Sequence, residues 1–402
     1  MGAHILTDFE ATRAMFDLPD GVIYLDGNSL GPLPKTAAAR VAQAVTAEWG
    51  QLLITGWNKA GWMDQPSRIG DRIAKLIGAE PGTVVMGDTL SIKVYQALAS
   101  ALEMNPSRRV ILSDTGNFPS DLYMAEGLCR TLGQGYSLKT VAPEDLSDAI
   151  DDTVAVTLIT EVDYRTGRLH DMAALTARAH AHGALTVWDL AHSAGAFPVH
   201  LAKCDADFAV GCTYKYLNSG PGGPAFIYVA PRHADVARPA LSGWLGHEAP
   251  FAFDPSYRPG AGIDRMRVGT PPVLQLAALE AALDIWDHAD IADVRSQSLA
   301  LTDRFIAGVE ATCPTLTLAT PRAHDHRASQ VSFRHPDGYA IMQALIARGV
   351  IGDFRSPDIL RFGFTPLYIT LSDVDRAVEI LAGVMANALW DDPQYKTRAK
   401  VT

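Results

Sequence analysis

Cysteine is scarce in this 402-residue chain, and its arrangement indicates neither a disulfide framework nor a metal site. Cys129, Cys204, Cys212 and Cys313 are scattered and form no CxxC pair, a pattern that fits a reducing compartment. No apolar stretch reaches the roughly 18 residues needed to span a bilayer. The N-terminal residues lack the basic start and apolar run of a signal peptide. We therefore expect a cytoplasmic protein with no metal site and no membrane segment.

Positive charge is also in short supply, since the formal net charge is -11. An acidic surface attracts neither nucleic acid nor an anionic membrane, so neither is expected as a partner. Internal repeats and low-complexity segments are absent as well. With 48% hydrophobic and 20% charged residues, the length predicts a globular protein of about two or three domains.

The middle of the chain alternates predicted strands and helices. The βα alternation implies a mainly parallel sheet, and the continuously apolar strand runs indicate that helices cover both of its faces. The fold class is therefore α/β, with a large domain built on a seven-stranded sheet. Strands are expected at 83–86, 109–113, 136–141, 154–160, 184–188, 207–212 and 225–230, and helices at 67–77, 90–103, 119–132, 143–150 and 171–182.

Other patterns lie on either side of this region. An irregular arm with a turn-rich loop at 26–32 comes first, and a helix is expected from Pro34 to about Trp49. After a Gly- and Pro-rich loop at 238–270, helices and short strands predict a small α+β domain. The expected division is an N-terminal arm and helix (1–66), a large domain (67–268), and a linking helix with a small C-terminal domain (269–402).

The segment from Ala184 to Gly223 concentrates residues with chemical potential. Asp189 ends one predicted strand, and Lys215 follows the next. Because the carboxyl ends of parallel strands line the ligand crevice of such a sheet, an acid and an amine placed there can face one bound molecule. A desolvated lysine suits imine formation with a carbonyl. A single Asp–Lys pair would by itself favour a strand-end acid and a surface lysine, but Tyr214 and the glycine turn at 219–223 favour a site.

These residues carry a family resemblance. The runs WDLAHSAGAFPVHL (188–201) and CTYKYLNSGPGGPAFIYV (212–229) are similar to the core of pyridoxal phosphate (PLP) enzymes of the aspartate aminotransferase fold, and within them to the kynureninase family. YLDGNSLGPLP (24–34), NFPSD (117–121), EVDYRTGR (161–168) and RFGFTPLYI (361–369) extend the match over nearly the whole chain. The resemblance implies PLP fold type I and hydrolysis of L-kynurenine, with 3-hydroxykynurenine as a further candidate, to anthranilate and L-alanine in tryptophan catabolism.

The resemblance also assigns roles around the cofactor. Lys215 would attach PLP and move the α-proton of the substrate, and Asp189 would keep the pyridine nitrogen protonated. His192 would reach the same cofactor, although a lone strand-end histidine is more often structural. Tyr214 would bond the phosphate and help to shuttle a proton. Thr160, at the end of its own strand, is a weaker candidate for the ring substituents.

A phosphate cup and a ring clamp are expected at two helix starts. Asp88 and Thr89 precede a predicted helix whose free amides suit a phosphate, although both are also preferred as ordinary N-caps. The resemblance alone brings Trp244 and Thr270 to the phosphate, one of them from the partner subunit of a homodimer. In the segment Phe118-Pro119-Ser120-Asp121, Phe118 would stack on the ring and Asp121 would join Asp189. The alternatives are a hydrophobic staple and a first-turn acid.

The substrate is expected to be a small amino acid held by an arginine. Arg361 lies in an apolar strand, so it either pairs internally or awaits an anion, and its planar fork suits an α-carboxylate. Arg355 is a rival that resembles a loop residue. Asn28 and Ser29 would complete the pocket. Trp57 would wall the aromatic end of the substrate or simply pack.

Two other functions fit the same fold. A cysteine desulfurase needs a mobile, reactive cysteine, and no cysteine lies in a glycine-rich lid; an aminotransferase needs a second carboxylate site, which no further arginine obviously supplies. A non-catalytic binding protein would be expected to lack Lys215 or to carry a basic DNA-binding segment, and the sequence shows neither feature.

Overall fold

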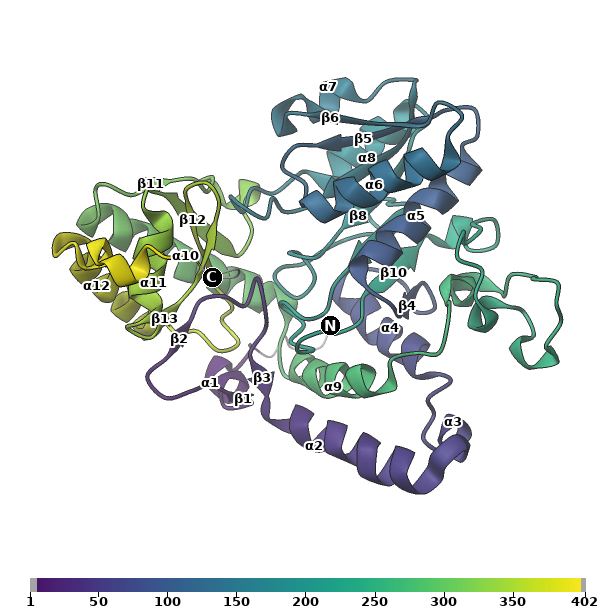
Figure 1. Cartoon of the computed structure of the whole chain (residues 1–402), viewed down its shortest axis with the longest axis horizontal. Helices are drawn as coiled ribbons and strands as arrows, with labels where there is room; N and C mark the ends of the chain where they lie inside the picture. Colours follow the sequence, from purple (N-terminus) through teal and green to yellow (C-terminus); the bar gives the residue numbers. More distant parts are fainter. Residues whose placement is uncertain (1–5, 399–402) are drawn as a thin grey trace.

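A seven-stranded sheet forms the centre of the computed structural model, which describes residues 6–398 (Figure 1). Its strand order is β4-β10-β9-β8-β7-β5-β6. All pairs from β6 to β9 are parallel, and β10 is antiparallel to both of its neighbours. The predicted α/β class with a mainly parallel sheet is confirmed. The strands are β4 (Val84–Met86), β5 (Val110–Asp114), β6 (Ser137–Val141), β7 (Val154–Thr160), β8 (Leu185–Asp189), β9 (Phe208–Gly211) and β10 (Phe226–Val229).

Helices cover both faces of this sheet. One face carries α5 (Leu90–Met104) and α6 (Pro119–Leu132). The other carries α4 (Gln65–Leu76), α7 (Leu146–Ala149), α8 (Met172–Ala181) and α9 (Val273–Leu283). Successive strand residues serve opposite cores: Val187 packs with α5 and α6, and Trp188 packs on the other side. Because both faces are buried, the strands read as continuous apolar runs rather than as alternating ones.

A second, antiparallel sheet with the order β11-β12-β15-β14 forms the small domain. Its strands are β11 (Thr317–Leu318), β12 (Gln330–Arg334), β14 (Asp353–Arg355) and β15 (Ile359–Gly363). The helices α10 (Ile291–Thr312), α11 (Gly338–Ile346) and α12 (Leu371–Ala386) pack around them. In the core, the ring of Phe305 lies 5.0 Å from the rings of both Phe362 and Phe364. Arg361 is thereby fixed in a buried strand.

The N-terminal arm belongs to the packing of this small domain, although it comes first in the sequence (Figure 1). It contains α1 (Phe9–Arg13), β1 (Phe16–Asp17), β2 (Ile23–Tyr24) and β3 (Leu33–Pro34). Strand β2 pairs in parallel with β13 (Val350–Ile351), and the amide of Gly363 donates to the carbonyl of Leu25 at 2.7 Å. This pairing brings the loop at 26–32 to the border with the large domain. The first five residues of the predicted arm lie outside the described part of the chain.

The helix expected from Pro34 begins at Lys35 as α2 (Lys35–Gln43) and continues as a π-helical stretch, Ala44–Leu52. A further helical turn, α3 (Gly56–Lys59), follows it. A Cβ at Gly56 would lie 2.5 Å from the ring of Trp62, so glycine at this position lets the Trp62 ring pack against the start of α3. Among residues 6–398, no helix is both long and apolar enough to cross a membrane.

Candidate active site

The carboxyl ends of β7, β8 and β9 deliver polar side chains to one cavity of about 190 Å³. The sheet side of the cavity is formed by Thr160, Asp189, His192, Tyr214 and Lys215, all of them predicted site residues. Ser91, Phe118, Ser120, Asp121 and Tyr164 line a second side, and Asn28, Ser29, Arg355 and Arg361 line a third. Residues from stretches far apart in the sequence therefore meet around one space.

Lys215 and Asp189 are held by their neighbours within this cavity. The Nζ atom of Lys215 lies 2.9 Å from Nε2 of His192. Asp189 is buried, and its two oxygens accept hydrogen bonds from the Thr160 hydroxyl and the Ala191 amide, both at 2.8 Å. Because β8 ends at Asp189, the carboxylate is fixed at the edge of the sheet.

Burial and mutual repulsion govern the acids of the cavity. Burial raises the pKa of Asp189, and Lys215 opposes this shift. The pKa of Asp121 is raised well above its usual range, first by burial and then by the charge of Asp189. Two neighbouring carboxyl groups that compete for one negative charge favour a cationic or protonated group between them. They could therefore hold a protonated ring nitrogen.

His192 is neutral in this setting, because burial and then Lys215 hold its pKa well below the usual value. Its Nδ1 atom is buried and has no hydrogen-bond partner among the described residues. A buried polar atom without a partner is unfavourable. The Gln330 side chain opposes the shift in the pKa of His192 through a hydrogen bond, so it is the neighbour that can satisfy this nitrogen.

A further acid, Glu161, lies behind Asp189 and was missed by sequence reasoning. Its backbone amide donates to the Asp189 carbonyl at 3.0 Å. Burial, and to a smaller extent the charge of Asp189, raise the pKa of the Glu161 carboxyl to about 7. Its position directly after β7 was the signal available in the sequence.

The two arginines of the cavity share one carboxylate. Arg361 is 1% exposed, and its Nε atom donates to Asp353 at 2.8 Å. Arg355 donates to the same carboxylate at 2.5 Å, and both guanidinium groups donate to the Ser29 hydroxyl, at 2.7 and 3.1 Å. Asp26 does not balance the second charge, since burial and the nearby Asp353 raise its pKa to about 8. A net positive charge therefore faces the cavity and suits a carboxylate.

The description of Arg355 as a loop residue is wrong, because it ends β14 and lines the cavity. Asn28 is fully buried beside these arginines, and neither its amide nitrogen nor its amide oxygen has a partner among the described residues. A Cβ at Gly363 would lie 2.1 Å from the Asn28 Oδ1 atom. Glycine at 363 thus makes room for an amide that is free to bind a ligand.

The start of α5 has the features of an anion site. Thr89 occupies the N-cap position, but its hydroxyl makes no capping hydrogen bond. Leu90 and Ser91 line the cavity, whereas the predicted residues Asp88 and Thr89 do not line it and are exposed. Free amides and an unused hydroxyl at a helix start suit a phosphate.

The segment before α6 presents an aromatic face to the same space. Phe118 is 41% exposed, and its ring meets that of Tyr164 edge to face at 5.1 Å. The Phe118 amide donates to the Asn117 side chain at 2.7 Å, which fixes the turn, and Pro119 then starts the helix. Tyr164, which lies in the run EVDYRTGR, was not predicted as a site residue.

Trp57, Trp244 and Thr270 do not line this cavity in the single chain. The Trp57 ring lies 6.1 Å from that of Trp244, which lies 5.7 Å from Phe251. The row becomes more exposed outwards, from 39% at Trp244 to 81% at Phe253. Thr270 is also exposed. These residues form part of the surface.

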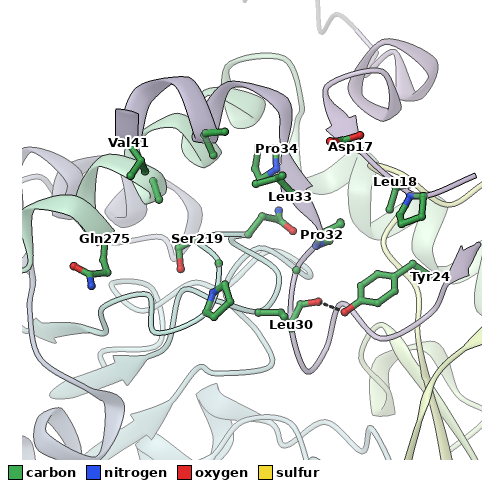
Figure 2. Close-up of a pocket in the computed structure, with 18 of the residues that line it drawn as sticks. Asp17, Leu18, Tyr24, Leu30, Pro32, Leu33, Pro34, Val41, Ser219 and Gln275 are labelled. Atoms are coloured by element: carbon green, nitrogen blue, oxygen red, sulfur yellow. Dashed lines mark hydrogen bonds between the residues drawn. The ribbon is translucent and has the colours of Figure 1, made fainter. Parts of the chain in front are cut away.

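A larger groove of about 670 Å³ lies between the arm, α2 and α9 (Figure 2). Its lining is mostly apolar, with Leu18, Leu30, Pro32 and Val41 among the residues. The Tyr24 hydroxyl, which lies in the groove, donates to the Leu30 carbonyl at 2.7 Å. None of the predicted site residues lines it, so the smaller cavity is the candidate active site. The described residues also contain no grouping of His, Cys, Asp and Glu suited to a metal.

Comparisons with known proteins agree with this geometry. Residues 294–381 match the family model of the kynureninase C-terminal domain. Kynureninases from Pseudomonas fluorescens and Burkholderia pseudomallei (strain K96243) are each 53% identical over 397 residues, covering 97% of this chain and 95% of the relative.

Solved structures share the fold at low sequence identity. A cysteine desulfurase from Thermococcus onnurineus NA1 is 20% identical, with a TM-score of 0.79 and coverage of 96% of this chain and 100% of that one. A mutant of C-DES with glycine covalently linked to its PLP cofactor is 19% identical, also with a TM-score of 0.79, and the match covers 92% of this chain and 98% of that one. The full-length identity to the curated relatives decides between these groups: the chain belongs to the kynureninase family.

Proposed function

We propose that this chain is a PLP-dependent hydrolase that cleaves L-kynurenine to anthranilate and L-alanine in tryptophan catabolism. Family membership along 97% of the chain supports this activity. The structural observation that carries it is the meeting of Lys215, Asp189 and Arg361 around one cavity. An amine, a ring acid and a carboxylate clamp are what a PLP enzyme acting on an amino acid requires.

The residues of the cavity suit PLP. Asp189 and Asp121 would hold the proton of the pyridine nitrogen, and Phe118 would cover the ring. Thr160 and His192 would bond the ring substituents. When bound, PLP supplies a carbonyl that takes up the substrate amine and a ring that withdraws electrons from the substrate. Asp88, Thr89, Ser120 and Tyr214 would surround the phosphate, with Pro119 fixing the start of the helix beside it.

The chain's own groups would then bind the substrate and move protons. Arg361 would hold the α-carboxylate, and Asn28 and Ser29 would complete its binding site. Lys215 would remove the α-proton of the substrate and deliver it to the cofactor carbon that carried the carbonyl. Tyr214 is the candidate general acid–base for the water that adds to the γ-carbonyl before the Cβ–Cγ bond breaks.

We further propose a cytoplasmic homodimer in which one of Trp244 and Thr270 reaches the phosphate from the partner subunit, while Trp57 walls the aromatic end of the substrate. The exposure of Trp244 and Thr270, and the row of rings that ends at Phe253, support this proposal because monomers rarely expose such aromatic patches. The four unpaired cysteines fit a reducing compartment. We also keep the division at residues 66 and 268 as a proposal for the domain boundaries.

A cysteine desulfurase activity is disfavoured by the thiols themselves. Burial raises the pKa of Cys129, Cys204, Cys212 and Cys313. A reactive cysteine needs the opposite shift, because the thiolate is the nucleophile.

Incubating the purified protein with PLP and L-kynurenine should release fluorescent anthranilate. The Lys215→Ala variant should release none above background. The proposal would be overturned if the PLP-loaded wild-type protein left kynurenine intact. Release of sulfide from cysteine would then indicate a desulfurase, and transfer of an amino group to a keto acid would indicate an aminotransferase.

A further inference from the structure

Lys93 is a fully buried amine outside the set of residues assigned above. It lies in the first turn of α5, and its Nζ atom has three polar partners. These are the Gln96 side chain at 2.9 Å, the Met266 carbonyl at 3.2 Å and the Asp88 carboxylate at 3.2 Å. An ammonium has three donors, so this contact set uses all of them. A fully buried lysine is rare unless it is paired.

The Asp88 partner lies directly beside the expected phosphate cup. Asp88 precedes the N-cap Thr89 and has a left-handed backbone with φ of +57°. Its carbonyl accepts from the Ala225 amide at 3.0 Å, which ties the turn to β10. A carboxylate at this place would repel a phosphate and compete for the same helix-start amides. The ion pair with Lys93 removes that conflict.

The same ammonium holds a second segment. Met266 lies four residues before Thr270, and the Val268 carbonyl between them accepts from the Leu245 amide at 3.3 Å. Leu245 follows Trp244. Lys93 therefore links the Asp88 turn to the backbone that carries the two residues which the family resemblance brings to the phosphate.

We propose that Lys93 is a positioning residue of the cofactor site, which neutralises Asp88 and fixes the turn before α5 so that the amides at the start of the helix can donate to the phosphate of PLP. This inference rests on the proposed function only in that PLP binds here. Burial lowers the pKa of Lys93, and Asp88 opposes that shift, so the pair is mutually dependent. Asp88 then contributes through its backbone conformation and not through a carboxylate contact with the cofactor.

The test compares apo-protein variants Lys93→Met, Asp88→Asn and the double variant, with Lys75→Met, an exposed lysine of α4, as the matched control. Binding of PLP and of pyridoxal, which lacks the phosphate, is measured by absorbance titration. Stabilisation by inorganic phosphate is measured by thermal unfolding of the apo-protein. Lys93→Met should weaken PLP binding by about tenfold, or about 1.4 kcal/mol, while pyridoxal binding and the control variant change little.

Substitution of Asp88 tests the electrostatic part of the proposal separately. Asp88→Asn should not weaken PLP binding, and adding it to Lys93→Met should restore most of the lost affinity and the phosphate stabilisation. Equal loss of PLP and pyridoxal binding in Lys93→Met, or no rescue in the double variant, would overturn the proposal. If Lys93→Met fails to fold, weaker PLP binding by the Asp88→Asn variant alone would overturn the proposal. Failure of the wild-type protein to bind PLP would overturn the proposed function as well, whereas a kynurenine-cleaving wild type with an unaffected Lys93→Met variant would overturn only this inference.

Discussion

The amine of Lys215 donates toward a neutral imidazole, since its Nζ atom lies 2.9 Å from Nε2 of His192 and the pKa of His192 is held well below its usual value. The histidine thus acts as an acceptor that fixes the lysine at the mouth of the sheet. Burial and the nearby Lys215 are the causes of its neutrality. The pair keeps the amine in the cavity without adding a second positive charge.

Replacing His192 with phenylalanine should keep an aromatic ring, although a larger one, and remove the acceptor. Because a hydrogen bond involving a charged group is worth roughly 1.5–3 kcal/mol, kcat/KM for kynurenine should fall about ten- to hundredfold. Turnover per bound PLP measures this effect and separates it from cofactor loss. Wild-type turnover in the variant would show that the contact does not serve the reaction.

Replacing Arg361 with lysine should raise KM more than it lowers kcat, because an ammonium cannot form the two parallel bonds that a guanidinium forms with a carboxylate. We expect an increase in KM of about tenfold or more. Arg355→Lys is the matched control, since Arg355 shares the Asp353 carboxylate but is less buried. Equal effects in steady-state kinetics would mean that both guanidinium groups hold the substrate.

Glu161→Gln should stabilise the protein at alkaline pH. Burial raises the pKa of Glu161 to about 7, whereas the unfolded value is about 4.3. An acid whose pKa is raised by folding lowers the free energy of unfolding as pH rises from its unfolded pKa to its folded pKa. Above the folded pKa the full destabilisation is present. The free energy of unfolding of the variant should therefore be higher than that of the wild type by on the order of 3 kcal/mol at pH 8. The difference should be much smaller at pH 5. Urea unfolding at both pH values measures this, and a less stable variant at pH 8 would contradict it.

Asp207→Asn should destabilise the large domain near neutral pH. This buried carboxylate accepts hydrogen bonds from His233, Arg232 and His180 at 2.7 to 2.8 Å. Burial alone would raise the pKa of Asp207, but these partners hold it below its usual range. An acid whose pKa is lowered by folding stabilises the folded state at pH values above its unfolded pKa of about 3.9. This contribution is lost as the pH falls below that value.

The free energy of unfolding of the Asp207→Asn variant should therefore be about 3 kcal/mol lower than that of the wild type at pH 7. The difference in unfolding free energy between variant and wild type should narrow below about pH 4, because the Asp207 carboxyl takes up a proton in the unfolded chain there while the folded one stays ionised. Thermal or urea unfolding across this range is the measurement. A constant gap at every pH would show that side-chain packing, and not charge, causes the loss.

The edge of the sheet could be predicted from the sequence because it follows from local rules. Thr160, Asp189 and Lys215 each lie at or just after the end of an apolar run, and the ends of parallel strands meet at one edge. The lengths of α5, α6 and β7 were also predicted closely, since their patterns are continuous. The resemblance then supplied the cofactor.

Long-range pairing could not be predicted in the same way. Nothing near Arg361 in the sequence identifies Asp353 and Ser29 as its partners, because strand pairing and the arm bring them together. Nor did the helical pattern from Pro34 to Trp49 indicate that its second half, Ala44–Leu52, is π-helical. Tyr164 likewise reaches the cavity from a turn whose direction is set by tertiary contacts.

The pairing of β2 with β13 has a consequence for synthesis of the chain on the ribosome. Strands β7, β8 and β9 leave the exit tunnel long before residues 350–363 do. A nascent chain therefore completes the sheet edge with Lys215 while the arm with Asn28 and Ser29 still lacks its partner strand. The pocket for the substrate carboxylate forms last, and a polypeptide that stops before β13 has the lysine but no place for the substrate.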